Sequence, residues 1–108
     1  MLRVAIRNIL PDKVDSLRDW MHEVDGPRRR EATATLVDEG CRCERAYLID
    51  GAHGPVLVYV MEVEDAARSE VAASRSSYPI DADHRAVLND TLGDHVPAEL
   101  LLDLVANK

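Results

Sequence analysis

The chain of 108 residues carries 20 acidic and 13 basic side chains, which give a formal net charge of -7 with the histidines neutral. This length corresponds to a single domain, 1–108, and the acidic balance argues against nucleic-acid or anionic-membrane partners, which require basic patches. No run approaches the roughly 18 apolar residues that cross a bilayer, and Arg3 and Arg7 interrupt the apolar start that a signal peptide would need. We therefore expect a soluble, cytoplasmic protein.

The N-terminal residues alternate between apolar and more polar side chains, which predicts a strand over 2–9. One set, Leu2, Val4 and Ile6, is expected to face the helices. The other set, which includes Arg3 and Arg7, would then face away from them.

Two helical pieces follow, over 12–24 and 28–38. The first has apolar residues at three- and four-residue spacing, with Trp20 beside them. Gly26-Pro27 separates the pieces, because proline removes a backbone donor and crowds the preceding turn. Gly40 is suited to the left-handed backbone that ends the second piece.

A β-hairpin is predicted next, with strands over 41–49 and 56–63 around a turn at 50–54. The second of these strands is rich in β-branched residues, which indicates a central position covered on both faces. Asp65 is the expected N-cap of a short helix over 66–73, and 74–80 is expected to be a loop.

A last helix is expected to begin with Asp81 as its N-cap and to stop at Gly93, with a final strand over 100–105. The resulting order is β-α-β-β-α-β. It predicts an α+β, ferredoxin-like fold, with a four-stranded antiparallel sheet and helices on one of its faces.

Both faces of the strands at 56–63 and 100–105 are apolar. A bare sheet face of this kind would exceed the few hundred Å² of apolar surface that monomers usually expose. We therefore expect two copies to pack face to face as a homodimer with a barrel-like form.

Several segments resemble an uncharacterised family of small bacterial and archaeal proteins, filed as a domain of unknown function. The resemblance spans essentially the whole chain and rests on 17–21, 31–36, Asp38-Glu39-Gly40, Tyr78-Pro79-Ile80-Asp81 and His84. That family is similar to the dimeric α/β-barrel superfamily, which includes small quinone-forming monooxygenases, lactone isomerases and haem-dependent enzymes. The resemblance implies the fold and carries no activity with it.

His84 is the leading candidate for chemistry, as a general base or a ligand, because it follows Asp81 and Asp83 at a helix start. The alternative is structural: the two aspartates cap the helix, and His84 packs its ring against Tyr78 or Trp20. We expect no metal site, because consecutive helix positions point in different directions.

Arg3 and Arg7 share a strand face with either Tyr59 or Glu62, depending on register. An arginine inside an apolar barrel is costly unless it is paired, so these residues would orient a carboxylate or phenolate substrate or form an intersubunit ion pair. The run 28–30 is expected to be a solvated face paired with neighbouring acids, and Cys41 and Cys43 to be free thiols.

Two main functions follow from these residues. The first is a homodimeric ligand-binding or structural protein without a cofactor, with His84, Tyr78, Trp20 and Tyr59 at the rim of an apolar cleft. The second is a cofactor-independent monooxygenase or isomerase, with His84 as base and an arginine or tyrosine polarising a small organic substrate. A haem-binding barrel with an axial histidine is a third hypothesis. An enclosed cavity with His84 directed inward would favour catalysis, and a filled core would favour structure.

Overall fold

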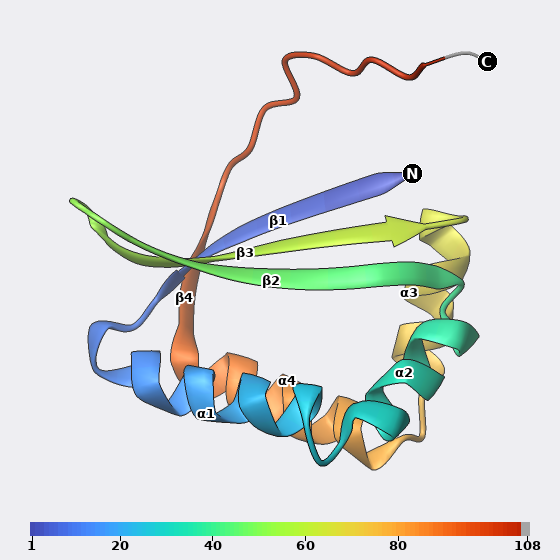
Figure 1. The fold of residues 1–108 in the computed structure, drawn as a ribbon, viewed down its shortest axis with the longest axis horizontal. Helices are drawn as coiled ribbons and strands as arrows, with labels where there is room; N and C mark the ends of the chain where they lie inside the picture. The colour runs from blue at the N-terminus through green and yellow to red at the C-terminus, as the bar shows by residue number, and fades with distance from the viewer. Residues whose placement is uncertain (107–108) are drawn as a thin grey trace.

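The computed structural model describes residues 1–106, in which helices pack against a four-stranded antiparallel sheet (Figure 1). The strands are β1 (Leu2–Ile9), β2 (Cys41–Gly51), β3 (Gly54–Val63) and β4 (Leu92–Val96). The helices are a 3-10 turn η1 (Pro11–Lys13), α1 (Val14–Asp25), α2 (Arg29–Asp38), α3 (Ala66–Arg75) and α4 (Pro79–Thr91). The strand order β2-β3-β1-β4 confirms the predicted ferredoxin-like α+β fold.

The first two thirds of the chain fold close to the predicted boundaries. Two helical pieces follow β1, and the hairpin joins β2 to β3 through a tighter turn than expected. Gly40 has φ +64°, so it provides the predicted left-handed end of α2. The Asp65 carboxylate accepts hydrogen bonds from two backbone N–H groups in the first turn of α3, as expected of an N-cap. None of the helices within residues 1–106 is long and apolar enough to span a membrane.

The predicted start of the last helix is wrong by three residues, because the N-cap was expected at Asp81. Helix α4 begins at Pro79, and Tyr78 occupies the N-cap position. Proline is favoured in the first turn because its fixed φ suits the helix and its missing N–H would have no partner there. Asp81 therefore lies inside the helix, where its carboxylate accepts a hydrogen bond from the Ser76 hydroxyl. The Glu31 carboxylate of α2 caps α4 from outside by accepting the Ile80 N–H at 3.0 Å.

The predicted position of the last strand is also wrong. The fourth strand is 92–96, directly after α4, and it pairs with the C-terminal half of β1. The end of α4 is held against β1 by the backbone bond from the Leu10 N–H to the Thr91 carbonyl, at 2.9 Å, so the chain enters the sheet at once. Polar residues such as Asp94 and His95 interrupt the apolar alternation in this short edge strand, so the hydrophobic pattern of the sequence does not predict it. The apolar segment at 100–105 has no secondary structure and is exposed.

The expected face assignment of β1 is wrong as well. Leu2 and Val4 are 67% and 52% exposed, whereas Ile9, of the opposite parity, is 3% exposed and packs in the core. Alternation shows which residues share a face of a strand, but it does not show which face the helices cover. The register places Val4 beside Val60 and Ala5 beside Tyr59, which packs against the core, so the more hydrophobic set of β1 lies on the face away from the helices.

The core lies at one end of the sheet, where Ile9, Leu17, Leu57 and Leu92 are all buried together. The opposite face of the sheet has no helix on it within residues 1–106 (Figure 1). We call this surface the outer face. The register places on it the side chains of Leu2, Val4, Ile6, Tyr47, Ile49, Val56, Val58 and Val60.

Candidate functional site

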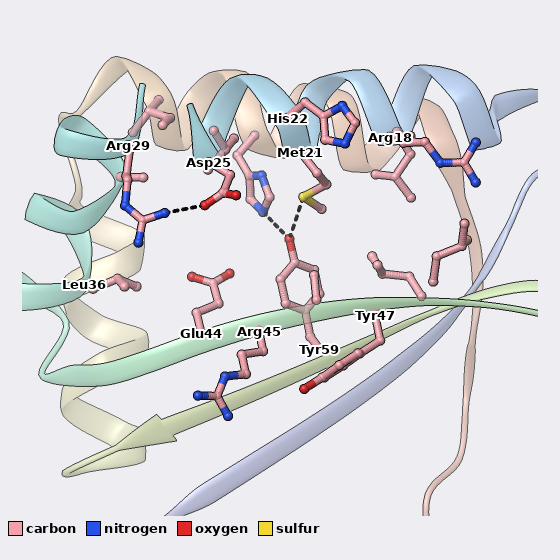
Figure 2. A pocket seen from close by; sticks show the side chains of 18 of the residues that line it. Arg18, Met21, His22, Asp25, Arg29, Leu36, Glu44, Arg45, Tyr47 and Tyr59 are labelled. Carbon is pink, nitrogen blue, oxygen red and sulfur yellow. Dashed lines mark hydrogen bonds and ion pairs between the residues drawn. The ribbon is translucent and has the colours of Figure 1, made fainter. Parts of the chain in front are cut away.

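A cavity of about 600 Å³ lies between the helices and the helix-facing side of the sheet (Figure 2). Its floor is formed by β2 and β3, and its walls by α1, α2 and the first half of α4. Its lining includes Met21, Glu44, Ala46, Leu48, Tyr59 and His84. This volume is in the range of sites that hold small organic molecules.

The cavity exists because the two layers meet at one end and stand apart at the other. The buried residues Ile9, Leu17, Leu57 and Leu92 fill the space between sheet and helices where β1 and β4 contact α1 and α4. Along the edge strand β2, the small side chain of Ala46 leaves space above the sheet, and Leu48 is 39% exposed although it faces the helices and pairs with the buried Leu57. Side chains therefore do not fill the space between these elements, in contrast to the tight packing of most protein interiors.

Three side chains form a hydrogen-bonded chain at the wall of the cavity. The indole N–H of Trp20, on α1, donates to Nδ1 of His84, on α4, at 2.8 Å. Nε2 of His84 lies 3.0 Å from the hydroxyl of Tyr59, on β3. The Tyr59 hydroxyl also lies 3.9 Å from the Met21 sulfur, which is a weak acceptor (Figure 2).

The order of donors in this chain follows from the chemistry of tryptophan. An indole nitrogen can only donate, so Nδ1 of His84 must accept and carries no proton. The neutral ring then has its proton on Nε2, which donates to the Tyr59 oxygen. The hydroxyl proton of Tyr59 is left to point at the Met21 sulfur or into the cavity.

Burial lowers the pKa of His84, against a weaker opposite effect of Asp81, so the neutral ring is favoured. Both ring nitrogens are engaged, and neither is free to take a proton from a ligand. The observed bonding therefore favours a positioning role for His84 over the general base expected from sequence. Burial, with the nearby Glu44, raises the pKa of Tyr59, so this hydroxyl stays protonated as a donor.

Glu44 is a candidate site residue that the sequence patterns did not indicate. It lies on β2 with its carboxylate directed toward the helices, beside Tyr59 (Figure 2). Its side chain is exposed to solvent through the open cavity. The protein around it still removes part of the water that would stabilise the charged carboxylate, which raises the pKa of Glu44, with a further contribution from Asp81. The alternation of β2 could have indicated it, because Glu44 lies on the same face of the strand as Ala46 and Leu48. Glu44 is therefore an acidic residue on the face that the helices cover.

The other predicted site residues separate into two groups. Asp81 lies with His84 and Tyr59 in the lining of the cavity, and Trp20 does not line it but is hydrogen-bonded to His84. Arg3 shares the Tyr59 face of the sheet but reaches α3, where it pairs with Glu70 at 3.2 Å. Arg7 donates twice to the Gly93 carbonyl, at 2.9 and 3.1 Å, and so anchors β4.

Tyr78 lies away from the main cavity, in a smaller one of about 240 Å³ between α2 and α3 that also contains Glu39. A hydrogen bond to Asp38 raises the pKa of Tyr78. Burial, together with Asp81 and other nearby carboxylates, raises the pKa of Glu39 to about 7.

The basic run and the cysteines have structural environments. Arg28 pairs with Glu31 at 3.0 Å and with Asp83 at 2.7 Å, which agrees with the predicted paired face. Both cysteines are free, and burial raises the pKa of the Cys41 thiol, which donates to the Cys43 carbonyl oxygen.

The topology and the cavity together define a mixed α+β protein with a ferredoxin-like sheet and a hollow between its two layers. The chain belongs to the family of unknown function DUF6176, whose sequence pattern matches residues 2–108. No curated protein matches the chain by sequence.

Proposed function

We propose that this protein is a cytoplasmic homodimer of the dimeric α/β-barrel kind that binds a small organic molecule in the cavity between its sheet and its helices. The single observation that carries this proposal is the cavity of about 600 Å³, open to a ligand and provided with directed polar groups. Apolar walls with a few convergent polar side chains are the usual composition of small-molecule sites.

The wall residues indicate the kind of molecule that fits. Leu17, Leu36 and Leu48 offer apolar surface, and the Tyr59 hydroxyl offers a proton to an acceptor atom. A flat, mostly apolar molecule with one oxygen acceptor matches these surfaces in size and chemistry. The two free cysteines are consistent with the reducing environment of the cytoplasm.

Binding is tested with 2-naphthol, a small planar probe with one hydroxyl group and its own fluorescence. The wild-type protein should change that fluorescence saturably, and Ala46→Trp, which fills the cavity floor, should weaken binding by at least about tenfold, which corresponds to 1.4 kcal/mol. Ala86→Trp places the same side chain on an exposed part of α4 and should bind as the wild type does. No saturable binding, or equal binding by both variants, would refute the proposal.

The dimer is supported by two apolar surfaces that a single copy leaves open. One is the outer face, on which Val4 and Ile49 are each 52% exposed. The other is the segment 97–106, which runs away from the sheet on the side opposite the helices (Figure 1) and exposes Leu101 and Leu104 by more than 80%. A second copy covers both at once, because each chain brings the same face and the same apolar segment to the contact.

The dimer is tested by sedimentation equilibrium at micromolar concentration. Wild type should sediment as a dimer, and Val58→Asp should sediment as a monomer, because the new charge lies at the centre of the outer face. Val37→Asp places the same charge on an exposed position of α2 and should remain dimeric. A monomeric wild type at this concentration would contradict the proposal.

A second candidate function is a cofactor-independent isomerase or monooxygenase. The observation that favours it is the pair formed by Tyr59 and His84, which are hydrogen-bonded to each other and directed into an open cavity. A binding protein needs only the shape of the cavity, whereas a fixed hydrogen-bond donor beside the Glu44 carboxylate is typical of acid–base chemistry.

A further inference from the structure

We propose that Glu44 and Tyr59 act together as base and hydrogen-bond donor in moving a proton on a small carbonyl compound, by way of its enolate. This inference rests on the proposed binding function and assigns a reaction to the same cavity. The inference depends on the placement of two side chains of complementary chemistry, Glu44 and Tyr59. Trp20 and His84 fix the orientation of Tyr59 through hydrogen bonds.

The spacing of the two groups suits such a substrate. Tyr59 pairs directly with Ala46 in the sheet, so Glu44, two residues along β2, is its diagonal neighbour on the same face. Diagonal neighbours on a sheet are roughly 7–8 Å apart at the backbone, and both side chains rise from it into the cavity (Figure 2). A carbonyl oxygen at Tyr59 and an adjacent C–H group at Glu44 fit between them.

The Tyr59 hydroxyl is positioned to donate a hydrogen bond to a bound substrate. Trp20 fixes the His84 proton on Nε2, and that N–H occupies a lone pair of the Tyr59 oxygen. The hydroxyl proton of Tyr59 then has only the Met21 sulfur, 3.9 Å away, as its partner in the described residues. A carbonyl oxygen is a much better acceptor than a thioether, so a bound substrate takes this hydrogen bond.

The Glu44 carboxylate is positioned to accept a proton from a bound substrate. No cation within residues 1–106 forms an ion pair with it, and its surroundings make its carboxylate more basic than in water. The charged or titratable groups that line the cavity with it are Arg18, His22, Asp25, Arg29, Arg45, Tyr47, Tyr59, Asp81 and His84. Among them, Asp81 raises the pKa of Glu44 and so increases its strength as a base.

The reaction balances without an oxidant or a reductant. The Glu44 carboxylate takes a proton from the carbon beside the carbonyl, and the electron pair of that C–H bond forms a carbon–carbon double bond. The carbonyl oxygen gains negative charge, which the Tyr59 hydrogen bond stabilises. Protonated Glu44 can return a proton to another carbon of the conjugated system, which gives an isomer of the substrate. A proton returned to the same carbon regenerates the substrate, and this route appears as exchange of that hydrogen with solvent.

The reaction is tested with 2-tetralone in deuterium oxide, by following the loss of its C1 protons in proton NMR spectra. 2-Naphthol resembles the enol of this ketone and should inhibit the exchange. Wild type should accelerate exchange over buffer, and Glu44→Gln should lose roughly 10²- to 10⁴-fold of the acceleration while still binding 2-naphthol. Tyr59→Phe should lose roughly 10²- to 10³-fold, because one donor to the oxyanion is removed.

Glu23→Gln is the matched control, since it makes the same change at an exposed position of α1, and it should exchange as wild type does. Glu44→Asp keeps the carboxylate and should restore part of the lost rate. If wild type binds 2-naphthol but Glu44→Gln exchanges 2-tetralone equally fast, the acid–base assignment is wrong while the binding function stands. If wild type does not bind 2-naphthol, the binding function fails first and the reaction fails with it.

Discussion

The hydrogen bond from Trp20 to His84 can be removed by a single substitution, Trp20→Phe, which keeps most of the buried ring but removes its only donor. Trp20 is 8% exposed, and its N–H is 2.8 Å from Nδ1 of His84. The guanidinium of Arg28, 5.6 Å from the centre of the Trp20 ring, can stack on phenylalanine as well. The main change is therefore confined to the His84 ring.

The magnitude follows from the value of one neutral hydrogen bond, about 0.5–1.5 kcal/mol. In wild type, protonating Nδ1 would set two N–H groups against each other, so the bond helps to hold the pKa of His84 down in addition to burial. At about 1.36 kcal/mol per unit, its loss should raise the pKa of His84 by roughly 0.4–1.1 units. Asp81, which already favours the protonated ring, would act in the same direction.

The assay is a pH titration of the histidine ring nitrogens by ¹⁵N-correlated NMR, with the His84 signals assigned from a His84→Gln variant. Wild type should show the neutral tautomer protonated at Nε2, and Trp20→Phe should titrate at higher pH. A wild-type ring protonated at Nδ1, or an unchanged pKa in Trp20→Phe, would refute the donor order and, with it, the free Tyr59 proton on which the proposed reaction depends.

Three further predictions concern stability, measured by urea denaturation. Burial and Asp81 raise the pKa of Glu39 to about 7, above its unfolded value, so its stabilising contribution is complete below about pH 4.5 and is lost as the pH rises to about 7. The Glu39→Gln variant should therefore lose less stability than wild type between these pH values. Parallel stability–pH profiles for the two proteins would contradict this. Asp65→Ala should cost about 1 kcal/mol through loss of the α3 cap, and no change would mean that the cap is dispensable. Leu57→Ala should cost about 2–5 kcal/mol, because Leu57 is 3% exposed in the core; a cost below about 1 kcal/mol would mean that the site collapses around the smaller side chain.

Local chemistry accounts for the features that the sequence predicted correctly. Asp65 caps a helix with its own carboxylate, and Gly40 adopts a left-handed backbone, and both depend only on near neighbours in the chain. The hairpin and the periodicity of β1 and α1 are local in the same sense. From the order of these elements the ferredoxin-like fold followed, because short connections leave few ways to pair four antiparallel strands.

Part of the candidate site was also readable from the sequence. His84, Tyr59 and Trp20 were singled out individually as chemical side chains, and the structure brings these three together. Their roles were not readable, because the donor order depends on which partner each ring nitrogen meets. Glu44 was missed for a related reason: an acid on a strand looks like a solvated residue until the covered face of that strand is known.

The sequence by itself determined the order of the elements, the fold and the bounds of every element before the last helix to within a few residues, since these depend on spacing and on residues close together along the chain. Only the tertiary structure decided which face of β1 the helices cover, because alternation is symmetric between the two faces of a sheet. It also placed β4 at 92–96, because the contact between Leu10 and Thr91 joins distant parts of the chain. The cavity also depends on tertiary structure, because it is the space left where the sheet and the helices do not contact each other. No local pattern of residues in the sequence predicts that space.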